Sequence, residues 1–217
     1  MRDHLALGIR EEEVTHPPTD PDLPIRQAVL VAIDFEATGS VPGYDNEPWQ
    51  IGMVRMREGC VEISDIFESY LQVGERPFNP YAPGNHHALR DTLAAAPTLS
   101  SLWGELGRPW LSGPLVAHNA GTERGLLQPV APLHDFGPWL DTLRLTRLAY
   151  PDLASHALQD VIDALGLADR LAELCPGRSA HDALYDAVGS ALILEQLLAH
   201  PAWKQLTFRQ AAARWKR

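Results

Sequence analysis

Four acidic residues and one histidine are the residues of this chain best suited to chemistry, and each stands where a strand or helix is expected to begin or end. They are Asp34, Glu36, Glu123, His181 and Asp186. Carboxylates brought together from distant segments, with no cluster of cysteines beside them, suit hard divalent cations such as Mg²⁺ or Mn²⁺. A histidine beside such a site indicates a group that removes a proton from water.

Asp34 lies in a nearly continuous apolar run, residues 28–35, which is typical of a strand buried on both faces, and Glu36 directly follows the run. Because residues two apart on a strand point to the same side, the two carboxylates share one face. Like charges there repel each other and lose hydration unless a cation neutralises them. The alternative is that the strand ends at Asp34 and that both acids are solvated.

Glu123 lies in the segment PLVAHNAGTERGLL, which predicts a short strand over residues 115–117, a loop, and a helix over residues 122–130. In the first helical turn, Glu123 is either a metal ligand or a charge that complements the helix dipole. His118 and Asn119 are candidate substrate contacts. Polar residues at such a position, however, more often satisfy backbone groups of their own loop.

His181 and Asp186 are five residues apart, which on one ideal helix would turn them about 140° away from each other. Asp182 is a good N-cap, so the helix is expected to begin at Ala183 and to leave His181 on the preceding loop. The two side chains can converge only in that arrangement. The alternative for His181 is a solvated loop histidine.

The remaining pattern predicts an α/β fold with a mixed five-stranded sheet flanked by helices. Besides the strands named above, the chain is expected to form strands at residues 49–57, 61–73 and 139–140, and a turn at Glu58-Gly59 joins the first two. Further helices are expected at residues 101–110, 142–149, 157–165, 182–198 and 208–217, and a long loop with one short helix at residues 74–97.

Length and charge set limits on function. A chain of 217 residues, 45% of them hydrophobic, can bury one sizeable core, and its net charge of -10 argues against a large basic surface that coats duplex nucleic acid. We expect three parts: an extended N-terminal arm (1–26), a catalytic domain (27–200) and a basic C-terminal helix or tail (201–217). The basic residues of the tail, which either hold a nucleic-acid strand or are simply solvated, are Lys204, Arg209, Arg214, Lys216 and Arg217.

The chain shows no sign of a membrane or secreted protein. Its two cysteines, Cys60 and Cys175, are far apart and indicate neither a zinc site nor a disulfide framework. No apolar run reaches the roughly 18 residues of a spanning helix, and the first residues lack the features of a signal peptide. We therefore expect a cytoplasmic protein without a membrane partner.

Two further groups of residues have competing explanations. Asp141 is acidic, but the run LDTL places it directly before a helix, where capping is the better explanation. His86 and His87 lie in the long loop, and their role is undecided.

Together these segments resemble the DEDDh exonucleases, the DnaQ-like group that includes RNase T and the proofreading subunit of bacterial replicative DNA polymerase. The likeness covers about residues 28–199. It rests on IDFEATG, AHNAGTE and HDALYD, in that order, with lesser matches at PWQIG, AAAPTL and LDTLRL. One departure is plain: the family usually has Phe-Asp where this chain has Thr122-Glu123.

The resemblance implies an RNase H-like fold and metal-dependent hydrolysis of nucleotides from the 3′ end of single-stranded DNA or RNA. Asp34 would bridge two cations, and Glu36 and Asp186 would complete the site of the ion that holds the nucleophile. Glu123 would serve the second ion, and His181 would be the general base.

The resemblance also implies a place for the substrate. The backbone around Ala37 and Thr38 would form the cradle of the terminal nucleotide. Whether the chain binds a polymerase or a second copy of itself is left undecided by the resemblance. Two other functions remain: a binding or scaffold module with weakened catalysis, indicated by Thr122-Glu123, and a phosphodiesterase acting on small nucleotides, favoured by the acidic charge.

Overall fold

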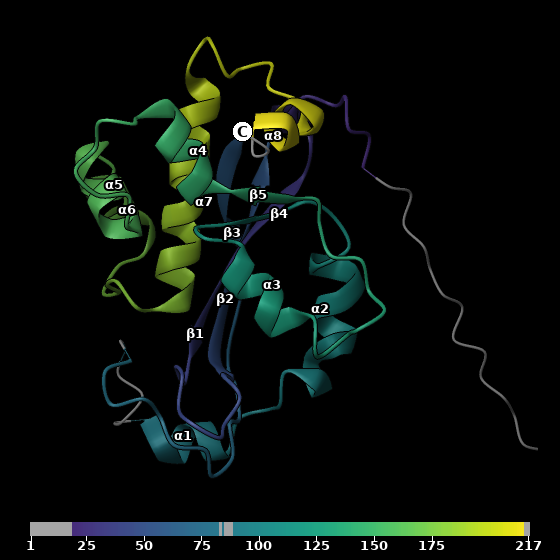
Figure 1. The fold of residues 1–217 in the computed structure, drawn as a ribbon, viewed down its shortest axis with the longest axis vertical. Helices are drawn as coiled ribbons and strands as arrows, with labels where there is room; N and C mark the ends of the chain where they lie inside the picture. Colours follow the sequence, from purple (N-terminus) through teal and green to yellow (C-terminus); the bar gives the residue numbers. More distant parts are fainter. Residues whose placement is uncertain (1–18, 83, 85–88, 215–217) are drawn as a thin grey trace, which may run out of the picture.

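The computed structural model describes residues 19–82, 84 and 89–214, and a mixed five-stranded sheet lies at its centre (Figure 1). The strand order is β3-β2-β1-β4-β5. β1 pairs antiparallel with β2 and parallel with β4. The strands are β1 (Leu30–Ala37), β2 (Pro48–Arg57), β3 (Cys60–Tyr70), β4 (Leu115–Ala117) and β5 (Trp139–Asp141). The predicted mixed sheet is confirmed. Since β1 continues past Asp34, the alternative in which the strand ends at Asp34 is excluded.

The helices lie where the sequence predicts them, with one exception. Their bounds are α1 (Arg90–Ala94), α2 (Trp103–Trp110), α3 (Gly121–Leu127), α4 (Thr142–Ala149), α5 (Leu158–Ala164), α6 (Ala168–Leu174), α7 (Ala183–Ala199) and α8 (Phe208–Arg214). The sequence does not predict α6, because seven residues are too few for a clear helical period. Within the described ranges, no helix has the length and apolar character needed to span a membrane.

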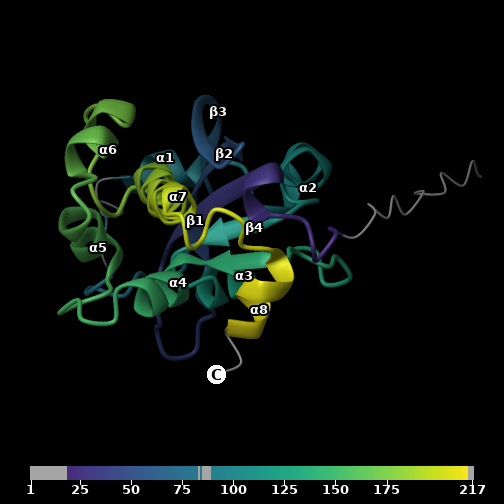
Figure 2. The same ribbon diagram turned by 90° about the horizontal axis from the view of Figure 1, so that it is seen from above.

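The two faces of the sheet carry different helices (Figures 1 and 2). Leu30 and Ala32 of β1 pack in the core formed with α5, α6 and α7, whereas Val31 and Ile33 pack in the core formed with α2 and α3. α7 is buried along most of its length, which explains why its sequence is apolar nearly all round. Since side chains alternate along a strand, Asp34 and Glu36 continue the face that α7 covers.

The segments before β1 and after α7 pack against each other. Ile25 is fully buried in the α7 core, and Pro24 forms a β-bridge with Thr207. Arg209 of α8 donates to both carboxylate oxygens of Asp22, at 2.7 and 2.9 Å. Ile25 therefore belongs to the core and not to an extended arm, and Phe208, which begins the predicted C-terminal helix, is buried. Residues 1–18 and 215–217, which hold the rest of both segments, lie outside the described residues.

Candidate active site

A glycine on β2 allows α7 to lie directly over the acidic end of β1. In the register of the two strands, Gly52 stands opposite Asp34. A Cβ atom on Gly52 would lie 2.2 Å from the backbone nitrogen of Leu184, in the first turn of α7. No other residue permits so close an approach of helix to strand. The first turn of α7, which carries Asp186, is thereby held beside Asp34.

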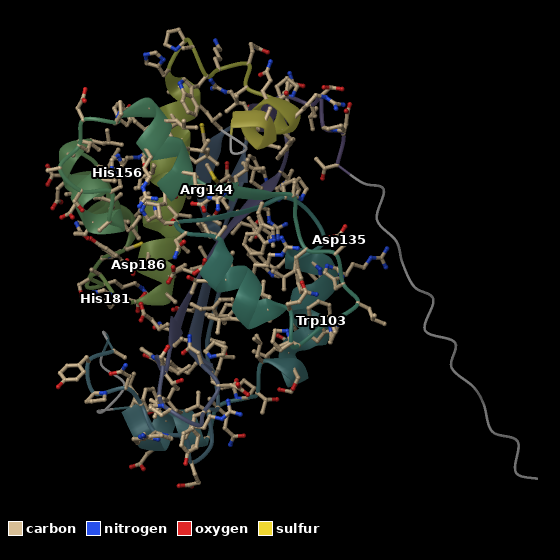
Figure 3. All side chains as sticks on the ribbon, in the orientation of Figure 1. Trp103, Asp135, Arg144, His156, His181 and Asp186 are labelled. Atoms are coloured by element: carbon tan, nitrogen blue, oxygen red, sulfur yellow. The ribbon has the colours of Figure 1, made fainter. Side chains whose placement is uncertain are left out.

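The start of α7 has the predicted geometry. Asp182 is the N-cap and accepts a hydrogen bond from the backbone N–H of Tyr185 (3.1 Å), so the helix begins at Ala183. His181 lies on the preceding loop with a left-handed backbone (φ 67°). Its N–H donates to Oδ2 of Asp186 (3.1 Å). Figure 3 shows the two residues together near one end of α7, as the sequence requires for convergence.

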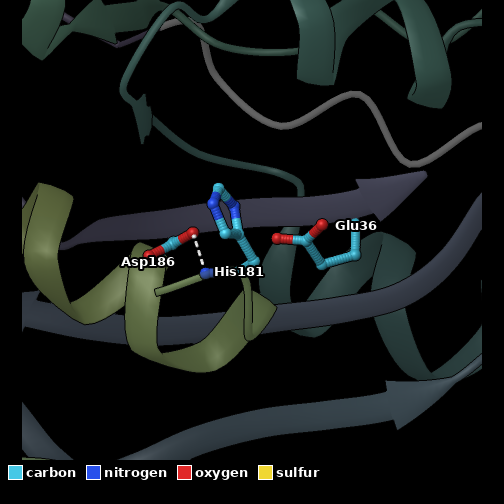
Figure 4. A group of neighbouring side chains, drawn as sticks. All are labelled: Glu36, His181 and Asp186. Carbon is cyan, nitrogen blue, oxygen red and sulfur yellow. Dashed lines mark hydrogen bonds between the residues drawn. The ribbon is translucent and has the colours of Figure 1, made fainter. Parts of the chain in front are cut away.

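His181, Asp186 and Glu36 form a cluster that could hold a metal ion. One ligand atom from each lies within 4.8 Å of the others. Figure 4 shows the imidazole of His181 between the carboxylates of Glu36 and Asp186. The group combines a buried, a half-buried and an exposed residue, so it is open to solvent on the side of His181.

Among the described residues, no arginine or lysine forms an ion pair with Glu36, Asp186 or Asp34. Burial, and then the negative charges of Asp186 and Asp182, raise the pKa of Glu36 to about 8. Burial is also the main cause that raises the pKa of Asp186 to about 6. The pKa of Asp34 is raised well above its usual range by burial and by the charges of Glu123, Asp186 and Glu36. A divalent cation would remove this mutual repulsion, so the donor set fits a metal.

Glu123 approaches from the other side of the sheet, in the first turn of α3. Its side chain is only 3% exposed, and burial raises its pKa to about 8. Its Oε2 atom is buried with no hydrogen-bond partner among the described residues. A charge that merely complements a helix dipole would remain in water, so the dipole alone does not explain Glu123. A buried carboxylate oxygen without a donor fits a ligand for a cation.

The candidate substrate contacts are partly engaged within the protein. Nδ1 of His118 lies 2.9 Å from Oγ1 of Thr142, and Nε2 lies 2.8 Å from the carbonyl oxygen of His156, to which it must donate. Burial is the main cause that lowers the pKa of His118, which favours the neutral ring. Both ring nitrogens would have to leave these partners to contact a substrate. Asn119 is exposed, in the left-handed region (φ 80°).

The backbone that is expected to bind the terminal nucleotide, just after Asp34 and Glu36, is also partly engaged in hydrogen bonds within the protein. The N–H of Thr38 donates to the carbonyl oxygen of Glu47 (2.8 Å), and its hydroxyl accepts from the N–H of Glu47 (3.0 Å). Thr38 is buried, whereas Ala37 is half-buried. A contact to substrate through Ala37 therefore stays a prediction, and one through the N–H of Thr38 would compete with Glu47.

Asp141 has the capping role that the sequence predicts. Its Oδ1 accepts from the backbone N–H groups of Leu143 and Arg144, at the start of α4, and from that of Asn119. This last bond fixes the loop between β4 and α3, and thus the entry to the helix that carries Glu123. The other undecided residues, His86 and His87, lie outside the described residues.

The chain is similar to a family of exonucleases and to DNA polymerase III proteins. A family model described as "Exonuclease" (RNase T) matches residues 31–194. A PolC-type DNA polymerase III of Staphylococcus haemolyticus is 28% identical over 190 residues, covering 85% of this chain and 12% of that protein. A DNA polymerase III subunit epsilon-like protein of Rhodobacter capsulatus is 27% identical over 186 residues, covering 84% of this chain and 25% of that protein. The chain thus spans at most a quarter of the length of these two relatives.

Solved structures share the fold. Exonuclease X in complex with 5′ overhanging duplex DNA superposes with a TM-score of 0.64 and 22% identity, over 84% of this chain and 98% of that one. Exonuclease I of E. coli in complex with an oligonucleotide gives a TM-score of 0.59 and 15% identity, over 81% and 41%. The family match and the shared fold define the class of this domain, which is an exonuclease domain. Because the family match covers most of its length, the chain belongs to the RNase T family of exonucleases.

Proposed function

We propose that this domain removes nucleotides from the 3′ end of single-stranded nucleic acid, in a metal-dependent hydrolysis. The observation that carries the proposal is the convergence of carboxylates from β1, α3 and α7 with raised pKa values and an unpartnered buried oxygen on Glu123. Such a set is costly to bury unless cations complete it. It is therefore better explained by a metal site than by the stability of the fold.

The carboxylates would hold two divalent cations, Mg²⁺ or Mn²⁺. Asp34 would be shared, with Glu36 and Asp186 on one side and Glu123 on the other; the central position of Asp34 among these charges supports this division. When bound, such cations orient the attacking water and stabilise the negative charge that develops on the phosphate and the leaving oxygen.

His181 would act as the general base. A ring nitrogen of His181 lies within 4.8 Å of a carboxylate oxygen of Glu36 and of Asp186. His181 is exposed, so water can reach this side of the site. An imidazole nitrogen would take the proton of the attacking water, and the exposed ring could pass it to solvent. Asp186, which accepts from the backbone N–H of His181, keeps this loop beside the carboxylates.

A degradation assay tests the proposal. Single-stranded DNA and RNA labelled at the 5′ end are incubated with the chain and Mg²⁺ or Mn²⁺, and we expect labelled products that shorten stepwise from the 3′ end. Asp34→Asn should abolish degradation and leave the fold intact, because it removes the shared charge without removing volume. No degradation of either substrate by the parent in Mn²⁺ would favour the scaffold module with weakened catalysis. Comparing the rates for DNA and RNA in the same assay gives the preferred substrate. Co-purification of proteins from a cytoplasmic extract would identify a polymerase partner.

A phosphodiesterase acting on small nucleotides is the second candidate. It is favoured by a cavity of about 1260 Å³ next to α3 whose lining is net acidic: it has three carboxylates, Asp45, Glu47 and Glu75, and one arginine, Arg76, which pairs with Glu47. Acidic walls repel the phosphates of a long strand more than those of a short substrate. Faster hydrolysis of a small phosphodiester than of the oligonucleotide would favour this function.

A further inference from the structure

A polar network on β2, β3 and α7 lies directly behind the proposed general base. At its centre is Asp182, the N-cap of α7. Its two carboxylate oxygens accept from Nη1 of Arg178 (3.0 Å each), and Oδ2 also accepts from Nε2 of Gln50 (3.1 Å). The N–H of Ala183 donates to Oε1 of Gln50 (3.3 Å). Arg178 also donates to Oε1 of Glu68 on β3 (2.8 Å), so the network joins the helix start to two strands.

Gln50 connects this network to the proposed metal-binding residues. It is 4% exposed, and its register partner on β1 is Glu36. A buried amide in an otherwise apolar strand is costly unless its hydrogen bonds are made, and here both ends of the amide bond the first residues of α7. The partners of Gln50, Asp182 and Ala183, directly follow His181 in the chain. A shift of the network would therefore move the imidazole relative to Glu36.

Arg178 also offsets the negative charge of Asp182. The carboxylate of Asp182 is close enough to the site to raise the pKa values of Asp34, Glu36 and Asp186 further. Arg178 is the cation paired with Asp182 among the described residues. Without it, Asp182 would keep its bonds to Gln50 and to the N–H of Tyr185 but would lose its countercharge.

The opposite end of α7 provides a matched comparison. There, Arg170 donates to Oε1 of Glu195 (2.7 Å), and Oε2 of Glu195 accepts from the backbone N–H of Val61 on β3 (2.9 Å). This pair also ties α7 to the β2–β3 hairpin with one arginine, one carboxylate and one backbone N–H. It lies three turns along the helix from Asp182, away from the carboxylate site.

We infer that Arg178 and Gln50 are positioning residues that, through Asp182, hold His181 and Asp186 opposite Asp34 and Glu36. The inference rests on the proposed function of that site. Its physical basis is that a small displacement of a reacting or ligating group lowers the rate far more than it lowers stability.

The test compares Arg178→Met with Arg170→Met. Each variant removes one arginine from a carboxylate that keeps a backbone N–H partner. Arg178→Met also removes the ion pair with Glu68, but that pair is solvent-exposed and adds little, so similar losses of thermal stability are expected. Arg178→Met should lower kcat about 10- to 100-fold, with KM for the oligonucleotide changed less than about threefold. Arg170→Met should keep kcat within about twofold of the parent. Equal kcat values for the two variants would overturn the inference.

Calorimetric titration with Mn²⁺ alone makes the test independent of turnover. Gln50→Met, which keeps the length of the side chain and the charge of the site but not the hydrogen bonds, should bind Mn²⁺ about tenfold more weakly than Arg170→Met, as expected when a residue that orients ligands is lost. Arg178→Met should bind Mn²⁺ more weakly too, but by less, because the uncompensated charge of Asp182 attracts the cation. A parent that fails to degrade DNA and RNA would refute the proposed function, whereas equal Mn²⁺ affinity of all three variants would refute the positioning role.

Discussion

Replacing Glu123 by glutamine should stabilise the metal-free protein at alkaline pH. In the fold, the pKa of Glu123 is raised from 4.5 to about 8. This corresponds to roughly 5 kcal/mol, at about 1.4 kcal/mol for each tenfold change in the proton equilibrium. Relaxation of the site and entry of water reduce the figure, so we expect Glu123→Gln to gain about 1–3 kcal/mol at pH 9. For a chain of this size, that is a rise in Tm of roughly 3–8 °C.

The sign of the effect depends on pH. Because the pKa is raised in the folded state, Glu123 costs no stability below about pH 4.5, and the cost is complete once the pH has passed about 8. The gain from Glu123→Gln should therefore disappear at pH 4.5. Thermal unfolding is measured in chelator at both pH values, and then with Mn²⁺, which should stabilise the parent more than the variant.

Asp141→Asn is the control for this prediction. Asp141 is also a buried acid near α3, but its Oδ1 accepts three backbone hydrogen bonds. Asparagine keeps an oxygen that can cap α4 but loses the negative charge, so the variant should be about 0.3–1 kcal/mol less stable than the parent in chelator. If Glu123→Gln is no more stable than the parent in chelator at pH 9, the carboxylate is not strained by burial, and the case for a missing cation there fails.

Three further outcomes follow from the site and its support. His181→Ala should lower kcat by roughly 10²- to 10⁴-fold, with partial recovery at high pH where hydroxide replaces the base; an equal loss at every pH would contradict this role. Glu123→Asp should lose nuclease activity, because a ligand withdrawn by about 1 Å orients poorly; higher activity than the parent would instead mark Glu123 as an impaired ligand. Gly52→Ala should lower both Tm and activity, since its Cβ would lie 2.2 Å from the nitrogen of Leu184; an unchanged Tm would show that α7 can move away.

Local patterns predicted the elements that carry the site. The alternation along β1 and the capping residue Asp182 were sufficient to place Asp34, Glu36, His181 and Asp186, because strand period and N-cap geometry are properties of short segments. The capping role of Asp141 followed from the same kind of signal. These predictions needed no information on what packs against each element.

Contacts between distant segments were not predictable in this way. Neither Gln50 nor Arg178 was identified as important, because the bonds of Gln50 to α7 span more than 130 residues of sequence. The available signal was a glutamine inside an apolar strand, in PWQIG. His118 shows the converse. Its position within the motif AHNAGTE indicated a contact to substrate, yet its ring is hydrogen-bonded to Thr142 and His156, which only the tertiary fold brings near.

The pairing of Pro24 with Thr207 has a practical consequence for handling the domain. Both described ends of the chain meet at the pole of the sheet where β1 begins, and the carboxylates stand toward the pole where β1 ends. A surface or a fused domain attached directly at residue 19 or residue 214, the ends of the described part, would therefore approach from the side opposite the carboxylates. A domain immobilised on a sensor chip in this way would expose its carboxylate site to nucleic acid in the solution.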